Sequence, residues 1–286
     1  MMMSMACFAV EDTFIKLLSA RLPATQILFS IGFGGALITL VLAIVLNVNL
    51  ADKILLNKHV ISRTIADLFG ALSFTSAMVL IPMSLLASIL QATPLFVTLG
   101  AAILLGEKVG WRRWSAIFIG FLGVIIILQP GYGSFQLASL LGLAAVLCLA
   151  LRDVVTRDMA TEIPTLTVTF YACLAMGSAG FIAYPFFGPP IMPTSYEAII
   201  LICAAIIGLT GYFLLVLATR KGDVSVIAPF RYSRLLFSLG LASLILGEKL
   251  TLPILLGGLL VVSSGIYTFG RERRSVKIQK SVNQKI

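Results

Sequence analysis

Apolar residues run through this chain in long blocks, and each block ends at a short connection that is polar or carries Gly or Pro. A helix that crosses a bilayer needs about 20 apolar residues, because the hydrocarbon core is about 30 Å thick. Ten segments meet this requirement: 2–20, 25–47, 61–81, 83–105, 113–129, 137–157, 165–187, 196–217, 224–246 and 251–270. The pattern predicts an all-α polytopic membrane protein with ten transmembrane helices, the lipid bilayer around it, and a basic polar tail at 271–286.

Composition agrees with this prediction. Hydrophobic residues make up 59% of the chain and charged residues 12%, about half of the charged fraction of a soluble domain. The net charge of +9 does not indicate a nucleic-acid partner, because the basic residues are spread over short loops and the tail. The four cysteines lie in apolar runs without a CxxC motif, so we interpret them as packing residues.

The distribution of basic residues predicts an orientation. With the N-terminus inside, the tail and the loops left in the cytoplasm hold most of the Lys and Arg residues, whereas the outer loops hold only Arg21 and Lys249. Positive residues are retained on the cytoplasmic side of membrane proteins. We therefore expect both termini in the cytoplasm, in a bacterial cell inner membrane.

The tetrapeptide LGEK occurs twice, at Leu105–Lys108 and Leu246–Lys249, each time at the end of an apolar run. The same offset of 141 residues also aligns, without a gap, Cys7 with Cys148, Asp12 with Asp153, Pro23 with Pro164 and Ser84 with Ser225. We infer two related halves, 1–141 and 142–270, of five spans each. Because five is odd, the second half is predicted to be inverted, an arrangement typical of transporters that open a central site to each side in turn. For LGEK itself we expect a structural helix stop, with a gating role as the alternative.

Two stretches carry a family resemblance. The 5+5 arrangement, the "P…LLGEK…W…G…GV" pattern from Pro94 to Val124 and its echo from Leu235 to Tyr267 resemble the drug/metabolite transporter superfamily, EamA type. The resemblance covers nearly the whole chain and implies a transporter built from two repeats. The stretch Ala228–Glu248 is similar to a subgroup that includes riboflavin-uptake members. An Arg that is usual early in the second span is absent, and Ser30 stands in its place.

Charged residues within the first and sixth spans point to a polar site, because a charge at the bilayer centre costs about 2.5–3.5 kcal/mol on insertion scales. Asp12 and Lys16 are four residues apart on one helix face, which favours a local ion pair. The repeat aligns Glu11 with Arg152. We expect these two to face a central cavity as an opposite-charge couple for the amine and carboxylate of a substrate, with Glu11 also able to exchange protons as coupling ions. The alternative is that they lie at helix ends in the interface.

The ninth span adds two arginines near mid-depth. Pro229 loosens this helix, and Arg231 and Arg234 then project on one side, with Tyr232 between them. We expect a substrate-binding pocket with an aromatic wall, since Arg suits a carboxylate, a phosphate or a ring. The alternative is a salt bridge from these arginines to Asp153 or Glu11.

The fourth span is aligned with the ninth by the repeat. Its Ser88 and Gln91 are candidates for a polar counter-wall, although such residues are often packing residues in membrane helices. Tyr212 is a candidate for further aromatic surface. Arg63 and Asp67 are four residues apart and are expected to form a structural pair at the cytoplasmic mouth.

These features favour a secondary transporter that moves a small-molecule substrate by alternating access. An amino acid or a related amphipathic metabolite is the first substrate class, and riboflavin or a similar aromatic vitamin is the second. A small-molecule channel is the alternative class. An intramembrane enzyme is disfavoured, because the chain has one His, His59, and no metal-ligand spacing. We expect no catalytic residue, cofactor or metal, and a monomer or homodimer.

Overall fold

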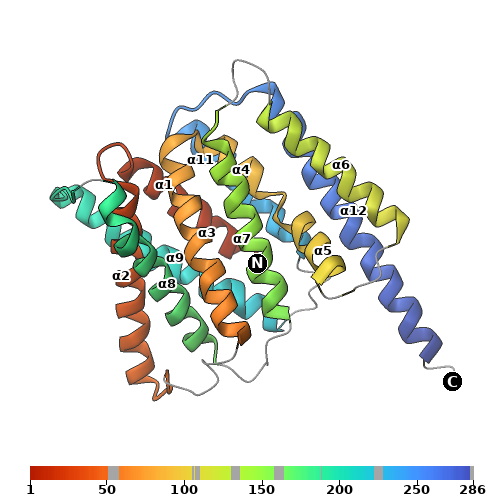
Figure 1. Ribbon diagram of the computed structural model, residues 1–286, viewed down its shortest axis with the longest axis horizontal. Coiled ribbons are helices and arrows are strands. Elements are labelled where there is room, and N and C mark those ends of the chain that lie inside the picture. The colour runs from red at the N-terminus through yellow and green to blue at the C-terminus, as the bar shows by residue number, and fades with distance from the viewer. Residues whose placement is uncertain are drawn as a thin grey trace.

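The computed structural model describes residues 1–50, 58–104, 106, 110–129, 136–157, 164–187, 189–221 and 228–283, which are almost entirely helical (Figure 1). The helices in chain order are α1 (Met2–Leu18), α2 (Ala24–Val45), α3 (Lys58–Leu80), α4 (Met83–Leu90), α5 (Thr93–Leu104), α6 (Trp111–Leu128), α7 (Ser139–Arg157), α8 (Thr165–Phe187), α9 (Ser195–Lys221), η2 (Ala228–Tyr232), α11 (Ser233–Leu244) and α12 (Leu252–Asn283). The described ranges contain no strand. The prediction of an all-α chain is therefore confirmed.

Several segments are long and apolar enough to cross a membrane. Within the described ranges these are Ala24–Val45, Ile61–Leu80, Met83–Leu104, Thr165–Pro185 and Ser195–Ala218, with Trp114–Leu128 and Leu252–Tyr267 as shorter apolar helices. Large apolar side chains on the outside of the helices are exposed. Ile44 and Phe118, for example, are 68% and 64% exposed. This is typical of surface that faces lipid. The number of ten membrane-spanning helices stays a prediction.

The predicted fourth span is two helices rather than one. α4 ends at Leu90 and α5 begins at Thr93, one residue before Pro94. Pro94 has no N–H to donate to the Leu90 carbonyl, and the Thr93 hydroxyl donates to that oxygen instead, at 2.7 Å. The ninth segment is also interrupted, since the 3-10 turn η2 contains Pro229 and changes to the α-helix α11 at Ser233. Both breaks lie at the level of the candidate site.

The most extensive contacts join helices that are far apart in the sequence. α2 packs along α8, α6 along α12, α3 along α7, and α1 along α9 and α11. Figure 1 shows the α6–α12 pair at one side of the molecule and α1, α2, α8 and α9 at the other. Glycines bring α6 and α12 close together, because a Cβ added at Gly257 would lie 2.6 Å from the Gly123 carbonyl oxygen. Such small-residue contacts are a common way for membrane helices to associate.

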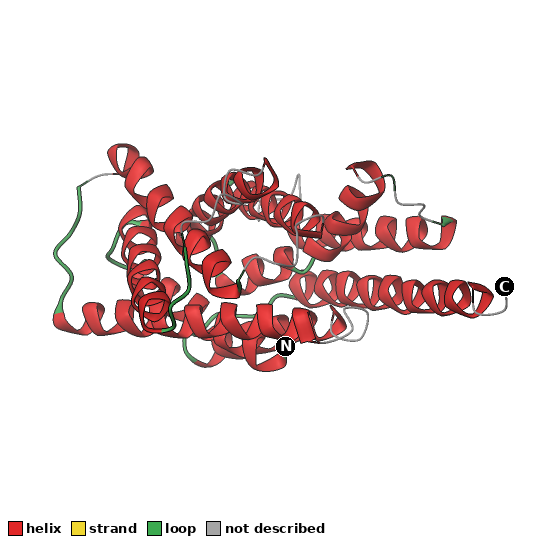
Figure 2. Ribbon diagram, turned by 90° about the horizontal axis from the view of Figure 1, so that it is seen from below, coloured by secondary structure: helices red, strands yellow, loops and turns green. Residues whose placement is uncertain are grey.

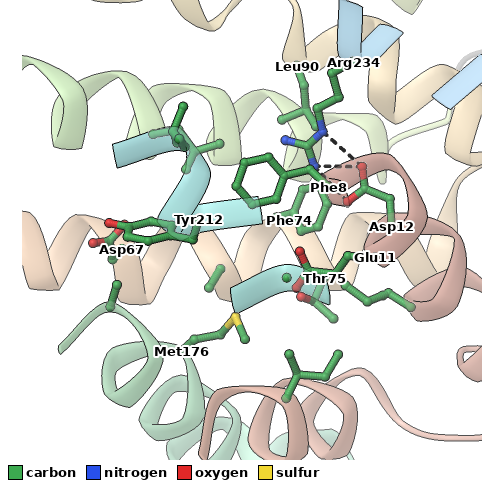
Figure 3. A pocket seen from close by; sticks show the side chains of 18 of the residues that line it. Phe8, Glu11, Asp12, Asp67, Phe74, Thr75, Leu90, Met176, Tyr212 and Arg234 are labelled. Carbon is green, nitrogen blue, oxygen red and sulfur yellow. Dashed lines mark hydrogen bonds and ion pairs between the residues drawn. The ribbon is translucent and has the colours of Figure 1, made fainter. Parts of the chain in front are cut away.

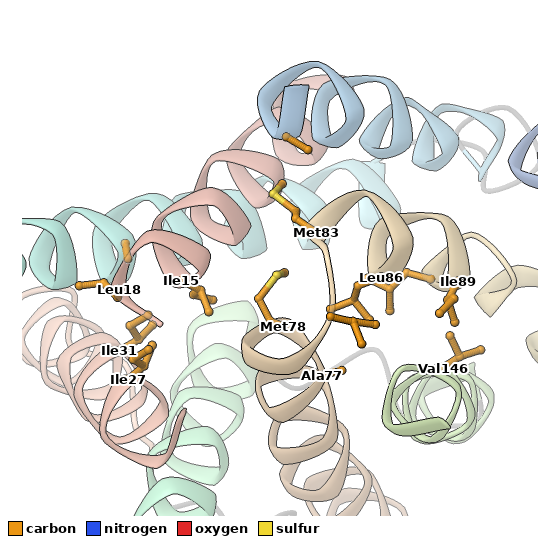
Figure 4. Packing of buried hydrophobic residues seen from close by; sticks show 14 of the residues in the cluster. Ile15, Leu18, Ile27, Ile31, Ala77, Met78, Met83, Leu86, Ile89 and Val146 are labelled. Atoms are coloured by element: carbon orange, nitrogen blue, oxygen red, sulfur yellow. The ribbon is translucent and has the colours of Figure 1, made fainter. Parts of the chain in front are cut away.

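A buried apolar cluster connects the helices that surround the candidate functional site (Figure 4). Ile15 and Leu18 of α1 meet Ile27 of α2, while Met78 of α3 and Leu86 of α4 continue the cluster toward α7. Each of these side chains is at most 6% exposed. The cluster fixes α1, α3 and α4 relative to one another at one end of the molecule.

The two LGEK segments end helices in the same way, as far as they are described. Gly106 and Gly247 have φ of +67° and +66°, the left-handed conformation that Gly adopts without strain. They follow the ends of α5 and α11. Of the first LGEK only Gly106 lies within the described residues. At the C-terminal end, the polar tail continues α12 as far as Asn283, and this extension projects beyond the other helices (Figure 2).

Candidate functional site

A cavity of about 250 Å³ lies among the helices, with most of its surface apolar. Its walls come from α1, α2, α3, α4, α5, α7, α8, α9, η2 and α11. α6 and α12 contribute no described residue to it. Figure 3 shows carboxylates, an arginine and aromatic rings turned toward this space. The cavity therefore combines charged groups with apolar and aromatic surface.

One ion pair crosses the cavity wall from α1 to α11. Asp12 accepts three hydrogen bonds from Arg234, with Nη2 at 2.7 Å from Oδ2 and 2.8 Å from Oδ1 and Nε at 3.1 Å from Oδ2. The guanidinium also lies 5.2 Å from the ring centre of Phe8 and 5.8 Å from that of Phe74, within cation–π range. This clamp fixes α11 against α1.

The expected local pair between Asp12 and Lys16 is wrong. Lys16 donates instead to the carbonyl oxygens of Met78, at 2.8 Å, and Ile81, at 2.7 Å. The reason is tertiary: α1 passes the end of α3, where carbonyl groups lack helical partners, while the side chain of Asp12 faces Arg234.

A second charged cluster joins α7, α3 and η2. Arg152 contacts Asp153 at 2.8 Å and Asp67 at 3.3 Å, and Asp153 also contacts Arg231 at 3.1 Å. Glu11 and Arg152 both line the cavity, as expected, and Arg152 is also paired with aspartates; their roles toward a substrate stay a prediction. For Arg231 the sequence left two alternatives open, a substrate-binding role or a salt bridge. The structure contains the salt bridge, to Asp153. Both Arg231 and Arg152 nonetheless line the cavity.

The predicted pair between Arg63 and Asp67 is present, with 3.8 Å between the charged atoms. It is part of a larger network, because Arg63 also donates to the Tyr212 hydroxyl and Asp67 contacts Arg152. Asp67 and Tyr212 both line the cavity. The pair thus links the wall of α3 to the wall of α9.

Glu11 differs from the other charged residues of the cavity. It makes no ion pair or hydrogen bond with any described residue, whereas Arg152, Arg231 and Arg234 all contact aspartates. Its carboxylate lies against Gly208 of α9, where an added Cβ would lie 2.7 Å from Oε2 and closer still to Oε1. Glu11 points into the space between α1 and the opposite wall in Figure 3. Among the described residues, it is the cavity charge without a counter-ion.

The structure brings most of the sequence-predicted site residues to one place. Those that line the cavity are Glu11, Gln91, Arg152, Tyr212, Arg231 and Arg234. The expectation that Ser88 and Tyr232 also line it is not met. Ser88 donates to the Ser84 carbonyl oxygen at 2.9 Å, and the ring of Tyr232 packs against Gly265 of α12. Substrate contact by the six cavity residues stays a prediction.

A comparison with protein families decides the class of the chain. The model of the family described as "EamA-like transporter family" matches residues 1–129 and 136–269. The chain belongs to the EamA-like transporter family. The apolar helices and this membership make it a multi-pass membrane protein, and the expected resemblance to EamA-type transporters is confirmed.

Curated relatives of this EamA-like chain have transporter names. It is 23% identical to the S-adenosylmethionine uptake transporter of Rickettsia prowazekii over 276 residues. This match covers 96% of this chain and 92% of the relative. It is 26% identical to the riboflavin transporter of Rhizobium johnstonii, over 75% of this chain and 70% of the relative. It is also 26% identical to the pseudopaline exporter CntI of Pseudomonas aeruginosa, over 89% of both chains. These names point to transporters rather than enzymes, and they differ in substrate and direction.

A solved crystal structure supports the fold of this EamA-like protein. It matches with a TM-score of 0.63 at 19% sequence identity and covers 95% of this chain and 98% of the other. At this level of identity the likeness concerns the fold alone.

Sequence reasoning missed several cavity residues of this EamA-like chain. Asp12 and Asp67 were assigned to local i,i+4 pairs, and Phe8 and Met176 gave no signal beyond hydrophobicity, yet all four line the cavity. The alignment of Asp12 with Asp153 could have found the first of them, because both aspartates bind arginines across the site. The aromatic and sulfur-containing walls could not be distinguished from lipid-facing surface by sequence pattern.

Proposed function

We propose that this EamA-like protein is a secondary transporter that moves a small amphipathic metabolite, an amino acid derivative with a cationic group, by alternating access. The observation that carries the proposal is the cavity, in which an unpaired carboxylate, Glu11, lies opposite aromatic and apolar walls. The cavity lies within one chain, which favours a functional monomer over a required homodimer.

Two inverted halves, 1–141 and 142–270, are part of this proposal. Supporting it, α2 and α8 begin 141 residues apart, at Ala24 and Thr165, and so do α6 and α12. The pairing of helices is also the same after the halves are exchanged, since α1 packs on α9 as α7 packs on α3. Two such halves can rock about a shared central site. By the distribution of basic residues, we place both termini on the cytoplasmic side of the inner membrane.

The charges of the cavity favour a cationic group on the substrate. Each cavity arginine contacts an aspartate, so an incoming carboxylate would have to displace one, whereas Glu11 is available to a cation. Phe8, Phe74 and Tyr212 offer aromatic surface beside it. S-adenosylmethionine, named for the Rickettsia relative, combines a sulfonium, an amine and an adenine ring and fits this description. Glu11 is also the group that we propose to exchange a proton when the substrate leaves.

A neutral aromatic vitamin is the second candidate. The name of the Rhizobium relative and the aromatic walls of the cavity favour riboflavin. Stacking on these rings would contribute most of its binding energy, and Glu11 would contribute little. The two candidates are thus distinguished by their dependence on one carboxylate.

The test is a binding panel followed by transport. Purified protein is heated in detergent with S-adenosylmethionine, amino acids, riboflavin, nucleosides or sugars, and each stabilising compound is tested for saturable uptake and counterflow in proteoliposomes. We expect a cationic compound to bind, and to lose at least about tenfold in affinity in Glu11→Gln, as expected for a charge-assisted hydrogen bond. Glu197→Gln, which removes a carboxylate that does not line the cavity, serves as the control.

Other outcomes would contradict parts of the proposal. A compound that binds equally well after Glu11→Gln and Arg234→Gln would place the site elsewhere. Riboflavin binding that is independent of Glu11 would support the second candidate. Flux that neither saturates nor shows counterflow would indicate a channel.

A further inference from the structure

Two charged residues outside the cavity meet at the turn between α3 and α4. Lys16 reaches this turn from α1 and donates to the carbonyl oxygens of Met78, at 2.8 Å, and Ile81, at 2.7 Å. The last carbonyls of a helix have no partners within it and carry the negative end of the helix dipole. A lysine ammonium group is therefore a good partner for the end of α3.

Glu248 approaches the same turn from the other half of the chain. Its Oε1 accepts a hydrogen bond from the Met83 N–H at 2.7 Å, and its Oε2 accepts from the Ser84 N–H at 2.9 Å and the Ser84 hydroxyl at 2.6 Å. These N–H groups open the first turn of α4, and Pro82, the residue before that helix, provides no side-chain cap. A carboxylate at the positive end of the helix replaces it.

The backbone conformation of the second LGEK segment directs the Glu248 side chain toward this turn. Gly247 has φ of +66°, which reverses the chain after α11, and the Glu248 N–H donates to the Ala242 carbonyl oxygen at 3.0 Å. The Glu side chain therefore leaves the connection between α11 and α12 in the direction of α4. The helix stop expected of LGEK is thus combined with a contact 165 residues away in sequence.

The turn held in this way joins two walls of the cavity. α3 carries Phe74 and Thr75 just before the turn, and the α4–α5 segment carries Gln91 after it. Lys16 belongs to the first half, like the turn itself, and its two hydrogen bonds hold α1 to the turn. Glu248 belongs to the second half, so its three hydrogen bonds fasten the halves together at one end of the cavity.

These contacts are of a kind that can open and close. Lys16 and Glu248 are both partly exposed, whereas the residues that they bind, Met78, Ile81, Met83 and Ser84, are at most 1% exposed. Release therefore needs water to enter the turn and replace these hydrogen bonds. The glycine contacts between α6 and α12 are different, since their main chains touch directly and separation would expose packed surface. The hydrogen bonds from Glu248 to the α3–α4 turn are therefore the contacts at which the halves can separate.

We propose that Lys16 and Glu248 form a latch on the α3–α4 turn that keeps one end of the cavity closed and that releases during each transport cycle. This inference rests on the proposed alternating-access function. In the proposed orientation the latch is at the external end, where α1 ends.

The reaction rate of a cysteine in the cavity can show whether the latch is closed. Of the four cysteines, Cys173 lines the cavity, and replacing Cys7, Cys148 and Cys203 by Ala leaves it as the single thiol. Its reaction rate with a small, charged, membrane-impermeant methanethiosulfonate is measured in right-side-out and in inverted vesicles. Glu248→Gln is compared with Glu197→Gln, which removes a carboxylate that pairs with Arg21 beyond the same end of α1.

We expect Glu248→Gln to raise the labelling rate about tenfold in one vesicle type, as loss of charge-assisted hydrogen bonds shifts the balance toward the open form, and Glu197→Gln to leave it unchanged. An unchanged rate in folded Glu248→Gln protein, or an equal rise in Glu197→Gln, would overturn the latch. If Glu248→Gln does not fold, Ser84→Ala removes one donor, and a rate that does not rise there overturns the proposal equally.

The design separates the latch from the claims on which it rests. Labelling needs no substrate, so the failure of any transport candidate leaves the result interpretable. A rise in inverted rather than right-side-out vesicles would support the latch and reverse the proposed orientation.

Discussion

The clamp between Asp12 and Arg234 allows a quantitative test of how charge is stabilised around the cavity. The side chain of Asp12 is only 3% exposed, whereas that of Arg234, which lines the cavity, is 21% exposed. Removing one partner of a buried ion pair costs about 3–5 kcal/mol, because the other charge is left uncompensated. Water in the cavity can hydrate Arg234 in part, so we expect Asp12→Asn to lower the free energy of unfolding by about 2–3 kcal/mol.

The double variant should cost less than the two single variants suggest. Arg234→Met also removes the cation–π contacts with Phe8 and Phe74, worth roughly 0.5–1 kcal/mol each, and leaves Asp12 buried without a partner. In Asp12→Asn/Arg234→Met no unpaired charge remains. We therefore expect a coupling energy of about 2 kcal/mol between the two positions.

The assay is equilibrium unfolding in mixed detergent micelles for the original protein, both single variants and the double variant. The exposed pair Arg21–Glu197 supplies a matched control cycle, for which a coupling of about 1 kcal/mol or less is expected. If the effects of Asp12→Asn and Arg234→Met simply add, the two side chains do not stabilise each other and the description of the clamp is wrong.

Three further substitutions test single contacts. Gly208→Ala places a methyl group where the Glu11 carboxylate lies. Because this carboxylate ends a flexible side chain that can move away, we expect unchanged thermal unfolding. We also expect about tenfold weaker binding of the cationic compound found in the panel. Tyr232→Phe removes a buried hydroxyl without a hydrogen-bond partner. We expect the free energy of unfolding to stay the same or rise by up to about 1 kcal/mol, with ligand affinity unchanged. A loss of affinity would show that Tyr232 belongs to the binding site. Gly257→Ala drives a methyl group into the main chain of α6 and should cost about 1–3 kcal/mol in detergent unfolding, whereas Gly240→Ala, which meets nothing within 4 Å, should cost nothing measurable.

The helices were largely predictable because membrane helices follow from the length of apolar segments. The predicted span 25–47 corresponds to α2, and 165–187 coincides with α8. The break between α4 and α5 was missed, because Thr93 and Pro94 lie within an apolar run that is long enough for a continuous helix. Hydropathy measures the cost of crossing a bilayer and says little about where main-chain hydrogen bonds are interrupted.

The partners of the charged residues were less predictable. The i,i+4 rule describes helices whose side chains have no better partner, and Asp12 has one 222 residues away in sequence. Tyr232 was placed beside Arg231 in the site, but η2 is a 3-10 turn, and neighbouring side chains there point about 120° apart. Tyr232 thus faces α12, while Arg231 faces the cavity. The repeat did identify Glu11 and Arg152 as positions that differ between the halves, and both line the cavity.

The long sequence separation of the charge contacts has a consequence for how the protein is made. α1 is synthesised well before its partners: the arginine that neutralises Asp12 follows 222 residues later, and the carbonyls that accept from Lys16 follow only with α3. An unpaired charge in lipid is costly, so α1 must remain near water, at the bilayer surface or within the insertion machinery, until its partners arrive. α1 is therefore secured only after most of the described helices have been made, and a chain truncated before α11 would leave Asp12 without its counter-ion.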